Sequence, residues 1–399
     1  MAHEGVVRFG ECEVDLARFE LRRASEVVHV EPQVFDVLAY LILHRDRMVS
    51  KHELLDAVWG TRFVSESALA TRVRAARAAI GDDGQRQDVI RTVHGRGYRF
   101  VADVVTGAPA VDEPGDAHLE QEIHLCQAPD GTRIAWATIG RGPPLVKAAN
   151  WMTHLDYDWE TPVWRHWLEG LARGRRLVRY DERGCGMSDW DTPTFGFDAW
   201  VDDLALVVDA AGLDRFPLLG VSQGAAVAVA YAVRHPERVS CLVLASAYAR
   251  GRMARATTDE QRREAELDVE LARVGWGRDD ATFRQVFTTL FLPDGTAEDW
   301  AEFNEVQRRS TSPANAVRFL EEFAVIDVST EARNVRCPTL LLHSRDDLRQ
   351  PMSNARELAA LIPGSRLVPL DSRNHLLTAR EPAWRVFLDE LEAFLAEHG

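Results

Sequence analysis

The chain has 399 residues, more than one compact core usually holds, so we expect two domains and exclude a single small module. Hydrophobic residues make up 46% and charged residues 27% of the sequence, which is typical of a globular protein and excludes a disordered or fibrous chain. The formal net charge is −15, yet residues 62–99 hold eight Arg against four Asp and Glu, a local excess of positive charge in an acidic protein that needs an explanation.

The first hundred residues predict a small domain of mixed secondary structure. Short alternating apolar pieces in the first thirty residues predict an antiparallel sheet. A first helix is expected to begin near Pro32, and a second follows Ser50 in a capping-box pattern. A third helix runs from a cap at Ser65 or Ser67 to Gly81, with an apolar stripe at helical spacing. A two-stranded ribbon with a glycine turn follows.

The third helix and the ribbon carry the basic residues. On the helix, Arg74 and Arg77 share one flank opposite the apolar stripe, Thr71 lies between the flanks, and Arg72 lies beside the stripe. A helix pair, an arginine-bearing helix and a basic hairpin are what a protein needs to read the major groove of DNA and grip its phosphates. A merely solvated basic helix face is the alternative that charge alone leaves open.

Residues 9–101 resemble the OmpR/PhoB-type winged-helix DNA-binding domain. The resemblance is carried by Leu21-Arg22-Arg23, Glu31-Pro32-Gln33-Val34-Phe35-Asp36, Val49–Leu55, Val58-Trp59 and Ile90–Phe100. It implies that the third helix enters the major groove, and we expect Thr71, Arg72, Arg74 and Arg77 on that helix to contact DNA, with Arg74 and Arg77 setting base preference. It also implies contacts to the DNA backbone or minor groove from Arg91, Thr92, Arg96 and Tyr98.

Residues 106–120 are rich in Pro, Gly, Ala and acidic residues, and they predict a linker between a domain at 1–105 and one at 121–399. In the second domain, apolar strands alternate with helices, which predicts a mostly parallel α/β sheet. The expected strands are residues 133–139, 144–149, 176–180, 216–221, 241–245, 338–343 and 366–370.

A Gly-x-Ser-x-Gly motif centred on Ser222 lies between an apolar strand and a helix, which is the context of a nucleophile elbow. A serine hydroxyl needs a base to take its proton and an acid to fix the tautomer of that base. Two carboxylates, Asp346 and Asp347, follow a late strand, and His375 follows the last one. The backbone N–H of Gln223 is the expected first donor of an oxyanion hole.

Residues 123–399 resemble the α/β-hydrolase fold, and most closely the hydrolase domains joined to signalling modules such as adenylate cyclases and winged helices. The motifs are Trp151–Trp159, Tyr180–Asp189, Ser222 in its elbow, Ser312–Ala316 and Cys337-Pro338-Thr339. The resemblance selects Asp347 as the acid, because Ser344 and Pro351 match the family's spacing around it. It implies the N–H of Trp151 as the second oxyanion donor. Residues 252–336 are expected to form a helical cap over the pocket.

These features predict a DNA-binding transcriptional regulator whose hydrolase domain senses, and can hydrolyse, a small ester, lactone or acyl compound. The enzyme class would be a serine hydrolase of carboxylesterase or lactonase type. Two alternatives stay open: a serine esterase that its winged helix only localises, and a binding-only receptor with a silent triad. The expected partners are double-stranded DNA, a small apolar acyl ligand and a second copy of the chain in a homodimer.

The sequence predicts no metal, cofactor or membrane contact. Its five cysteines are an odd number without a close pair, which favours neither a disulfide framework nor a metal cluster. The first residues lack the pattern of a signal peptide. Residues 216–233 carry no charge, but their glycines, proline and serine indicate a strand, a turn and a helix rather than a membrane span. We therefore expect a cytoplasmic protein.

Overall fold

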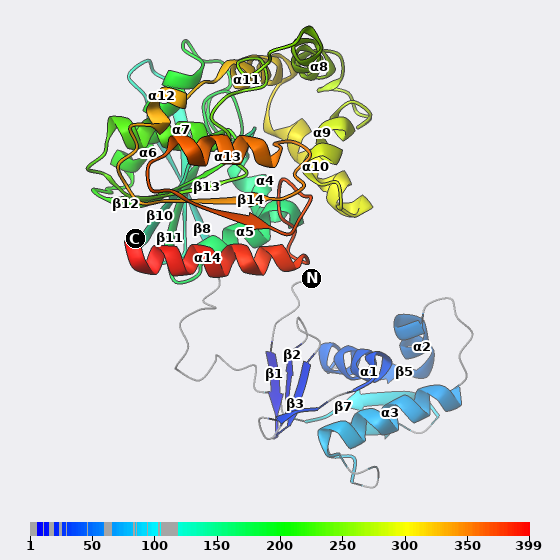
Figure 1. Ribbon diagram of the computed structural model, residues 1–399. Helices are drawn as coiled ribbons and strands as arrows, with labels where there is room; N and C mark the ends of the chain where they lie inside the picture. Colours follow the sequence, from blue (N-terminus) through cyan, green and yellow to red (C-terminus); the bar gives the residue numbers. More distant parts are fainter. Residues whose placement is uncertain are drawn as a thin grey trace. The chain divides into compact units, whose positions relative to one another are not determined.

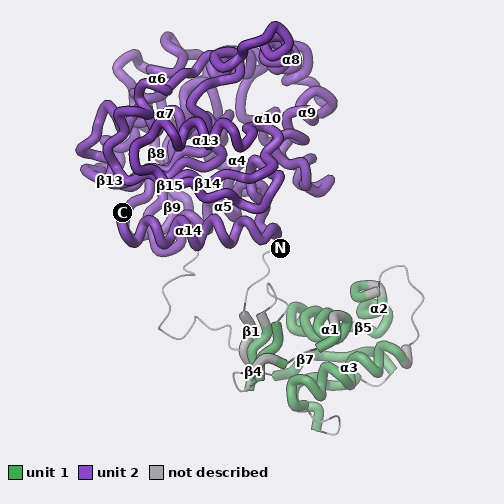
Figure 2. Tube along the Cα trace, viewed as in Figure 1, with its two compact units in different colours: residues 1–113 green, residues 114–399 purple. Residues whose placement is uncertain are grey.

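The computed structural model describes residues 6–10, 12–15, 20–23, 26–28, 30–45, 47–59, 66–82, 84, 86–93, 95–102, 104 and 119–399. The chain divides into two compact units, residues 1–113 and 114–399 (Figure 2). The expected linker falls almost entirely outside the described residues, as do Ser65 and the side chain of Ser67.

Unit 1 combines small antiparallel sheets with helices. One sheet has the strand order β1 (Val6–Phe9), β2 (Cys12–Asp15), β3 (Glu20–Arg23) and β4 (Glu26–Val27). The helices are α1 (Pro32–Leu43), α2 (Lys51–Trp59) and α3 (Glu66–Ile80). The second sheet has the order β5 (Val49–Ser50), β7 (Gly97–Phe100) and β6 (Ile90–Val93), so that β6 and β7 form the predicted ribbon (Figure 1).

The helices of unit 1 begin and pack as their sequences predict. The hydroxyl of Ser50 accepts the backbone N–H of Glu53 at 3.1 Å, which caps α2. The apolar stripe of α3 is buried in one core with α1 and both sheets. Gly97 is required where β7 meets β5, because a Cβ there would lie 1.9 Å from the carbonyl oxygen of Val49.

Unit 2 is built on an eight-stranded sheet with the order β15-β14-β13-β12-β10-β11-β9-β8. The strands are β8 (Gln121–Gln127), β9 (Arg133–Ile139), β10 (Pro144–Lys147), β11 (Arg176–Tyr180), β12 (Phe216–Val221), β13 (Val239–Ala245), β14 (Thr339–Ser344) and β15 (Arg366–Leu370). Strands β10 to β15 pair in parallel, whereas β9 runs antiparallel to both β11 and β8.

Helices cover both faces of this sheet (Figure 1). α5 (Pro162–Ala172) and α14 (Pro382–His398) pack on one face, and α6 (Phe197–Ala210), α7 (Gly224–Arg234) and α13 (Met352–Leu361) on the other. The short helices α4 (Leu155–Glu160) and α12 (Ser329–Ala332) lie in connections. No helix in the described part of the chain is long and apolar enough to span a membrane.

Residues 252–336, called the cap segment below, lie in the chain between β13 and β14. The segment contains α8 (Asp259–Gly275), α9 (Arg284–Phe291), α10 (Ala297–Ser310) and α11 (Pro313–Val325), as well as α12. A Thr258 capping box begins α8 and a Thr296 capping box begins α10. Helices joined by short turns therefore make up most of the segment.

Strand β8 is a strand of unit 2 that the sequence did not indicate. It forms one edge of the sheet, and Ile123 and Leu125 are 37% and 62% exposed. Because most of its side chains contact solvent, the strand lacks the apolar run that identifies the buried strands.

Candidate active site and DNA-binding surface

Ser222 lies in a tight turn between β12 and α7. Its φ angle is +53°, a strained value for a residue other than glycine. The strand and the helix approach each other closely on either side: a Cβ on Gly220 would lie 2.5 Å from the Cα of Ala225, and one on Gly224 would lie 2.4 Å from the carbonyl oxygen of Ala149. The two glycines of the motif are thus sterically required, and the turn brings the serine to the carboxyl end of the central strand.

Ser222, His375 and Asp347 form a continuous hydrogen-bonded chain. The Nε2 atom of His375 lies 2.9 Å from the Oγ of Ser222, and its Nδ1 lies 2.8 Å from the Oδ2 of Asp347. The other oxygen of Asp347 accepts two backbone N–H groups of the following turn, each at 2.8 Å. The neighbouring Asp346 is exposed. The arrangement can hold the imidazole with its proton on Nδ1 and its free Nε2 toward the hydroxyl.

Two contacts that the sequence did not indicate hold the loop of His375. The hydroxyl of Ser246 donates to the carbonyl of His375 at 2.9 Å. The backbone N–H of His375 donates to the carbonyl of Phe291, at the end of α9, also at 2.9 Å. The Phe291 ring lies edge-on to the imidazole, with centroids 4.9 Å apart. The cap segment therefore contacts the candidate base directly.

The expected oxyanion donors differ in their availability. The backbone N–H of Gln223 has no hydrogen-bond partner among the described residues. The N–H of Trp151, by contrast, donates to the side-chain Oε1 of Gln223 at 2.6 Å, and Trp151 has a φ angle of +51°. In this conformation the expected second donor is therefore covered, because glutamine at the position after the nucleophile is long enough to reach the neighbouring loop, and the part of the two N–H groups in an oxyanion hole stays a prediction.

The amide of Gln223 is also held from its other end. Its Nε2 lies 3.4 Å from both carboxyl oxygens of Glu182, which is buried. Burial, reinforced by the negative charge of Asp203, raises the pKa of Glu182 well above its usual range. Glu182 thus braces the glutamine side chain that covers the N–H of Trp151.

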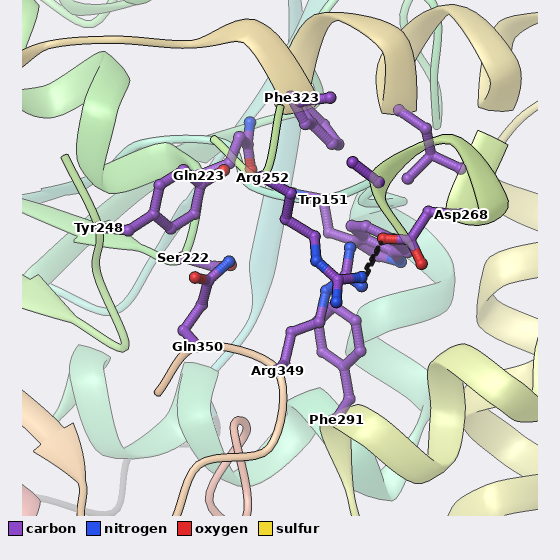
Figure 3. Close-up of a pocket in the computed structure, with 13 residues that line it drawn as sticks. Trp151, Ser222, Gln223, Tyr248, Arg252, Asp268, Phe291, Phe323, Arg349 and Gln350 are labelled. Carbon is purple, nitrogen blue, oxygen red and sulfur yellow. Dashed lines mark hydrogen bonds and ion pairs between the residues drawn. The ribbon is translucent and has the colours of Figure 1, made fainter. Parts of the chain in front are cut away.

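A pocket that is partly open to solvent lies beside Ser222 (Figure 3). The sequence predicted an apolar ligand, but three charged side chains, Arg252, Asp268 and Arg349, line this pocket. No sequence signal identified them, because packing of the cap segment brings them to the serine. The remaining lining residues are Trp151, Gln223, Tyr248, Ala265, Phe291, Leu320, Phe323, Ala324 and Gln350.

In unit 1, the expected DNA-contacting residues separate into two groups. Thr71 and Arg74 on α3 are exposed, as are Arg91 on β6 and Arg96 in the ribbon turn. Arg99 on β7, which the sequence analysis left out of the contact set, is exposed directly across from Arg91. Like charges in that position repel each other unless an anion lies nearby, so the ribbon register adds Arg99 to the basic surface.

The second group makes contacts within unit 1. The guanidinium of Arg77 donates to the carbonyl of Ile90 at 2.5 and 3.0 Å and to the hydroxyl of Thr92 at 2.9 Å, and its side chain is only 12% exposed. We therefore correct the expectation that Arg77 contacts bases: it fastens α3 to the ribbon. This contact also engages the hydroxyl of Thr92, which was expected to reach DNA.

Two further expected contacts are largely internal. Arg72 forms an ion pair with Glu31 at 3.1 Å and donates to the side chain of Gln33 at 3.3 Å, which ties α3 to the start of α1. Tyr98 is buried in the core of unit 1. The exposed residues of the first group therefore carry the candidate DNA-binding surface.

Comparison with known families agrees with the division into two units. The chain belongs to the α/β-hydrolase-fold family, because the family model described as alpha/beta hydrolase fold matches residues 160–378. A second family model, described as transcriptional regulatory protein, C terminal, matches residues 25–100. The protein therefore joins an OmpR/PhoB-type winged-helix domain of transcriptional regulators to an α/β-hydrolase domain.

Individual relatives match the hydrolase part. The chain is 30% identical over 241 residues to the 2-hydroxy-6-oxo-2,4-heptadienoate hydrolase of Pseudomonas putida, covering 57% of this chain and 77% of the relative. It is 28% identical over 257 residues to the AB hydrolase superfamily protein YisY of Bacillus subtilis, covering 63% and 92%. The crystal structure of the esterase RhEst1 from a Rhodococcus species aligns with a TM-score of 0.57 and 26% identity, covering 69% and 99%.

Proposed function

We propose that the protein is a transcriptional regulator whose hydrolase domain binds and hydrolyses a small acyl compound, and that occupancy of this pocket alters DNA binding. The observation that carries the proposal is the hydrogen-bonded chain of Ser222, His375 and Asp347 at the wall of a pocket, in the same polypeptide as a DNA-binding domain. The similarity to an esterase and to a dienoate hydrolase supports hydrolysis as the reaction.

The proposed chemistry is acyl transfer through the serine. The Oγ of Ser222 attacks the acyl carbonyl while its proton passes to Nε2 of His375, and Asp347 stabilises the imidazolium that forms. Collapse of the tetrahedral intermediate expels the leaving group, which takes the proton from His375. Water then attacks the acyl-enzyme with the same histidine as base, releasing the acid and restoring the serine.

The backbone N–H of Gln223 would stabilise the oxyanion in both steps. The N–H of Trp151 would join it once the substrate displaces the amide of Gln223, with which it forms a hydrogen bond in this structure. That covered donor specifically favours a second candidate function, a receptor that binds an acyl ligand with little or no turnover. The two candidates share the pocket and the nucleophile, and they differ in the rate of deacylation.

For DNA, the proposal assigns backbone and base contacts to the exposed side chains Thr71, Arg74, Arg91, Arg96 and Arg99. A single winged helix with this few exposed cations binds one half-site weakly. We therefore propose that the protein acts as a homodimer on a pair of half-sites, with the hydrolase domain supplying the dimer contact.

Two linked measurements test the proposed function. A fluorophosphonate probe should label the wild type and fail to label Ser222→Ala, and 4-nitrophenyl butyrate should be hydrolysed only by the wild type. Labelling without turnover would identify the receptor. A duplex selected from a random-sequence pool should then be titrated by fluorescence anisotropy with labelled and unlabelled protein.

The labelled and unlabelled forms should differ in DNA affinity by about 5- to 150-fold, the usual range of allosteric coupling. Coincident titration curves, together with unchanged sedimentation, would show that the winged helix only localises an esterase. Absence of any selected duplex would remove the regulatory part of the proposal and leave the hydrolase part intact.

A further inference from the structure

The pocket beside Ser222 carries an excess of positive charge. Arg252 precedes α8, Asp268 lies within α8, and Arg349 lies two residues after Asp347 in the loop that follows β14. These three are the charged side chains that line the pocket, so its wall has a net charge of +1. Because this charge lies in the pocket beside the candidate nucleophile, it can contribute to ligand recognition as well as to folding.

The two arginines converge on one carboxylate oxygen (Figure 3). The Nη1 atoms of Arg252 and Arg349 each lie 2.8 Å from the Oδ2 atom of Asp268. Each guanidinium has five N–H donors, and among the described residues Asp268 is the one side-chain acceptor that either of them contacts. Donors in excess of the acceptor therefore remain on both arginines.

The surroundings of Arg349 make the unbalanced charge costly. Its side chain is 8% exposed, and its guanidinium lies 5.5, 5.9 and 5.7 Å from the ring centroids of Trp151, Phe287 and Phe291. Ring faces offset part of the loss of hydration, but they accept no strong hydrogen bond. One shared carboxylate neutralises one of the two cations, and a second anion would balance the other.

Asp268 is ionised and belongs to this arrangement. Burial alone would raise the pKa of its carboxyl, but the two neighbouring guanidiniums outweigh burial and hold the pKa below its ordinary value. The protonated form of Asp268, which would leave both guanidiniums without a counter-charge, is therefore disfavoured at neutral pH. The excess is thus one positive charge.

We propose that Arg252 and Arg349 form a carboxylate-binding subsite, so that the acyl compound accepted by Ser222 carries a carboxylate on its acyl part. This inference rests on the proposed function of the same pocket. A carboxylate fits because its two oxygens match the paired donors of a guanidinium. The apolar side chains of Leu320 and Phe323, which also line the pocket, suit the hydrocarbon between the two ends of such a ligand.

The test compares two matched substrates, the mono-4-nitrophenyl ester of adipic acid and its neutral analogue, methyl 4-nitrophenyl adipate. The wild type should prefer the acid by at least 10-fold in kcat/KM. Arg252→Gln should reduce that preference by about 10- to 100-fold, the range of a lost hydrogen bond to a charged group. Arg252 is the better target, because Asp268 keeps Arg349 as its partner.

Arg262→Gln is the matched control, since Arg262 lies on α8, the helix of Asp268, but is exposed and paired with Asp259. It should keep the wild-type preference. Arg252→Lys, which retains the cation, should recover part of it. Equal hydrolysis of the two esters by the wild type, or an equal loss for both in Arg252→Gln, would overturn the subsite and leave hydrolysis by Ser222 intact.

A binding measurement separates this inference from turnover. Calorimetric titration of Ser222→Ala with monomethyl adipate and dimethyl adipate should show at least 10-fold tighter binding of the monoacid. Adding Arg252→Gln should abolish the difference. If neither substrate is hydrolysed but this difference is present, the subsite stands and the hydrolase proposal fails. If the monoacid and the diester bind alike, the subsite is refuted whatever the activity.

Discussion

Replacing Asp347 with asparagine provides a sharp test of the proposed base. The carboxylate contacts three N–H groups: two backbone donors on Oδ1 and the Nδ1 of His375 on Oδ2. An asparagine that keeps the two backbone hydrogen bonds through its oxygen must turn its NH₂ toward His375. Two donors cannot face each other, so the imidazole is expected to move its proton to Nε2, where it can no longer accept the proton of Ser222.

This tautomer change should lower kcat by about 10⁴-fold, the loss seen when the same change is made in a serine protease triad. At about 1.4 kcal/mol per tenfold, the loss corresponds to about 5.5 kcal/mol of transition-state stabilisation. Initial rates with 4-nitrophenyl butyrate and the rate of fluorophosphonate labelling should both fall, whereas calorimetric binding of a non-reacting ester should persist.

Asp346→Asn is the control, because Asp346 is exposed and adjacent in sequence. It should change kcat by no more than about twofold, since an exposed charge contributes little. His343 cannot readily substitute as the base, because its Nε2 is hydrogen-bonded to the carbonyl of Gln350 at 2.7 Å. A larger loss in Asp346→Asn than in Asp347→Asn would refute the assignment of the acid and the reasoning from geometry behind it.

Three further changes test other parts of the structure. Arg77→Ala should destabilise the winged helix by about 1.5–3 kcal/mol in urea denaturation, because it removes hydrogen bonds from a charged donor. Arg74→Ala should leave the stability unchanged and weaken DNA binding. Equal stabilities of the two variants would contradict the role of Arg77 in joining α3 to the ribbon. Gly224→Ala should cost at least about 1–3 kcal/mol in thermal unfolding, because its Cβ would overlap a backbone oxygen, and an unchanged Tm would show that the loop can yield. Gln223→Ala should raise kcat/KM for a short aryl ester by about 3- to 10-fold by uncovering the N–H of Trp151, and a decrease would show that the glutamine amide assists the reaction.

The residues of the elbow were predictable because local sterics impose them. Gly220 and Gly224 must be glycine because a Cβ at either position would overlap backbone atoms close to the serine or in the adjacent loop, so the sequence motif reflects the local geometry. The order of Ser222, Asp347 and His375 follows from strands of one parallel sheet, whose carboxyl ends meet at the same edge.

The charged wall of the pocket was not predictable in this way. Asp268 and Arg349 lie 81 residues apart, and they meet only because α8 of the cap segment packs against the loop that follows β14. Arg77 was misplaced for a related reason: the helical period puts it on an exposed flank of α3, but the ribbon folds back against that flank. In both cases tertiary packing determines which side chains meet, and the residue pattern of one helix does not predict which other element packs against it.

Phe291 couples the cap segment to the candidate base, His375. Its carbonyl accepts the backbone N–H of His375, and its ring lies against the imidazole, so a displacement of α9 would also displace the candidate base. On the proposed function, the lifetime of an acyl-enzyme at Ser222, and not the ligand concentration alone, would set how long DNA binding stays altered. With slow deacylation, the altered DNA binding would persist for some time after the ligand concentration in the cell has fallen.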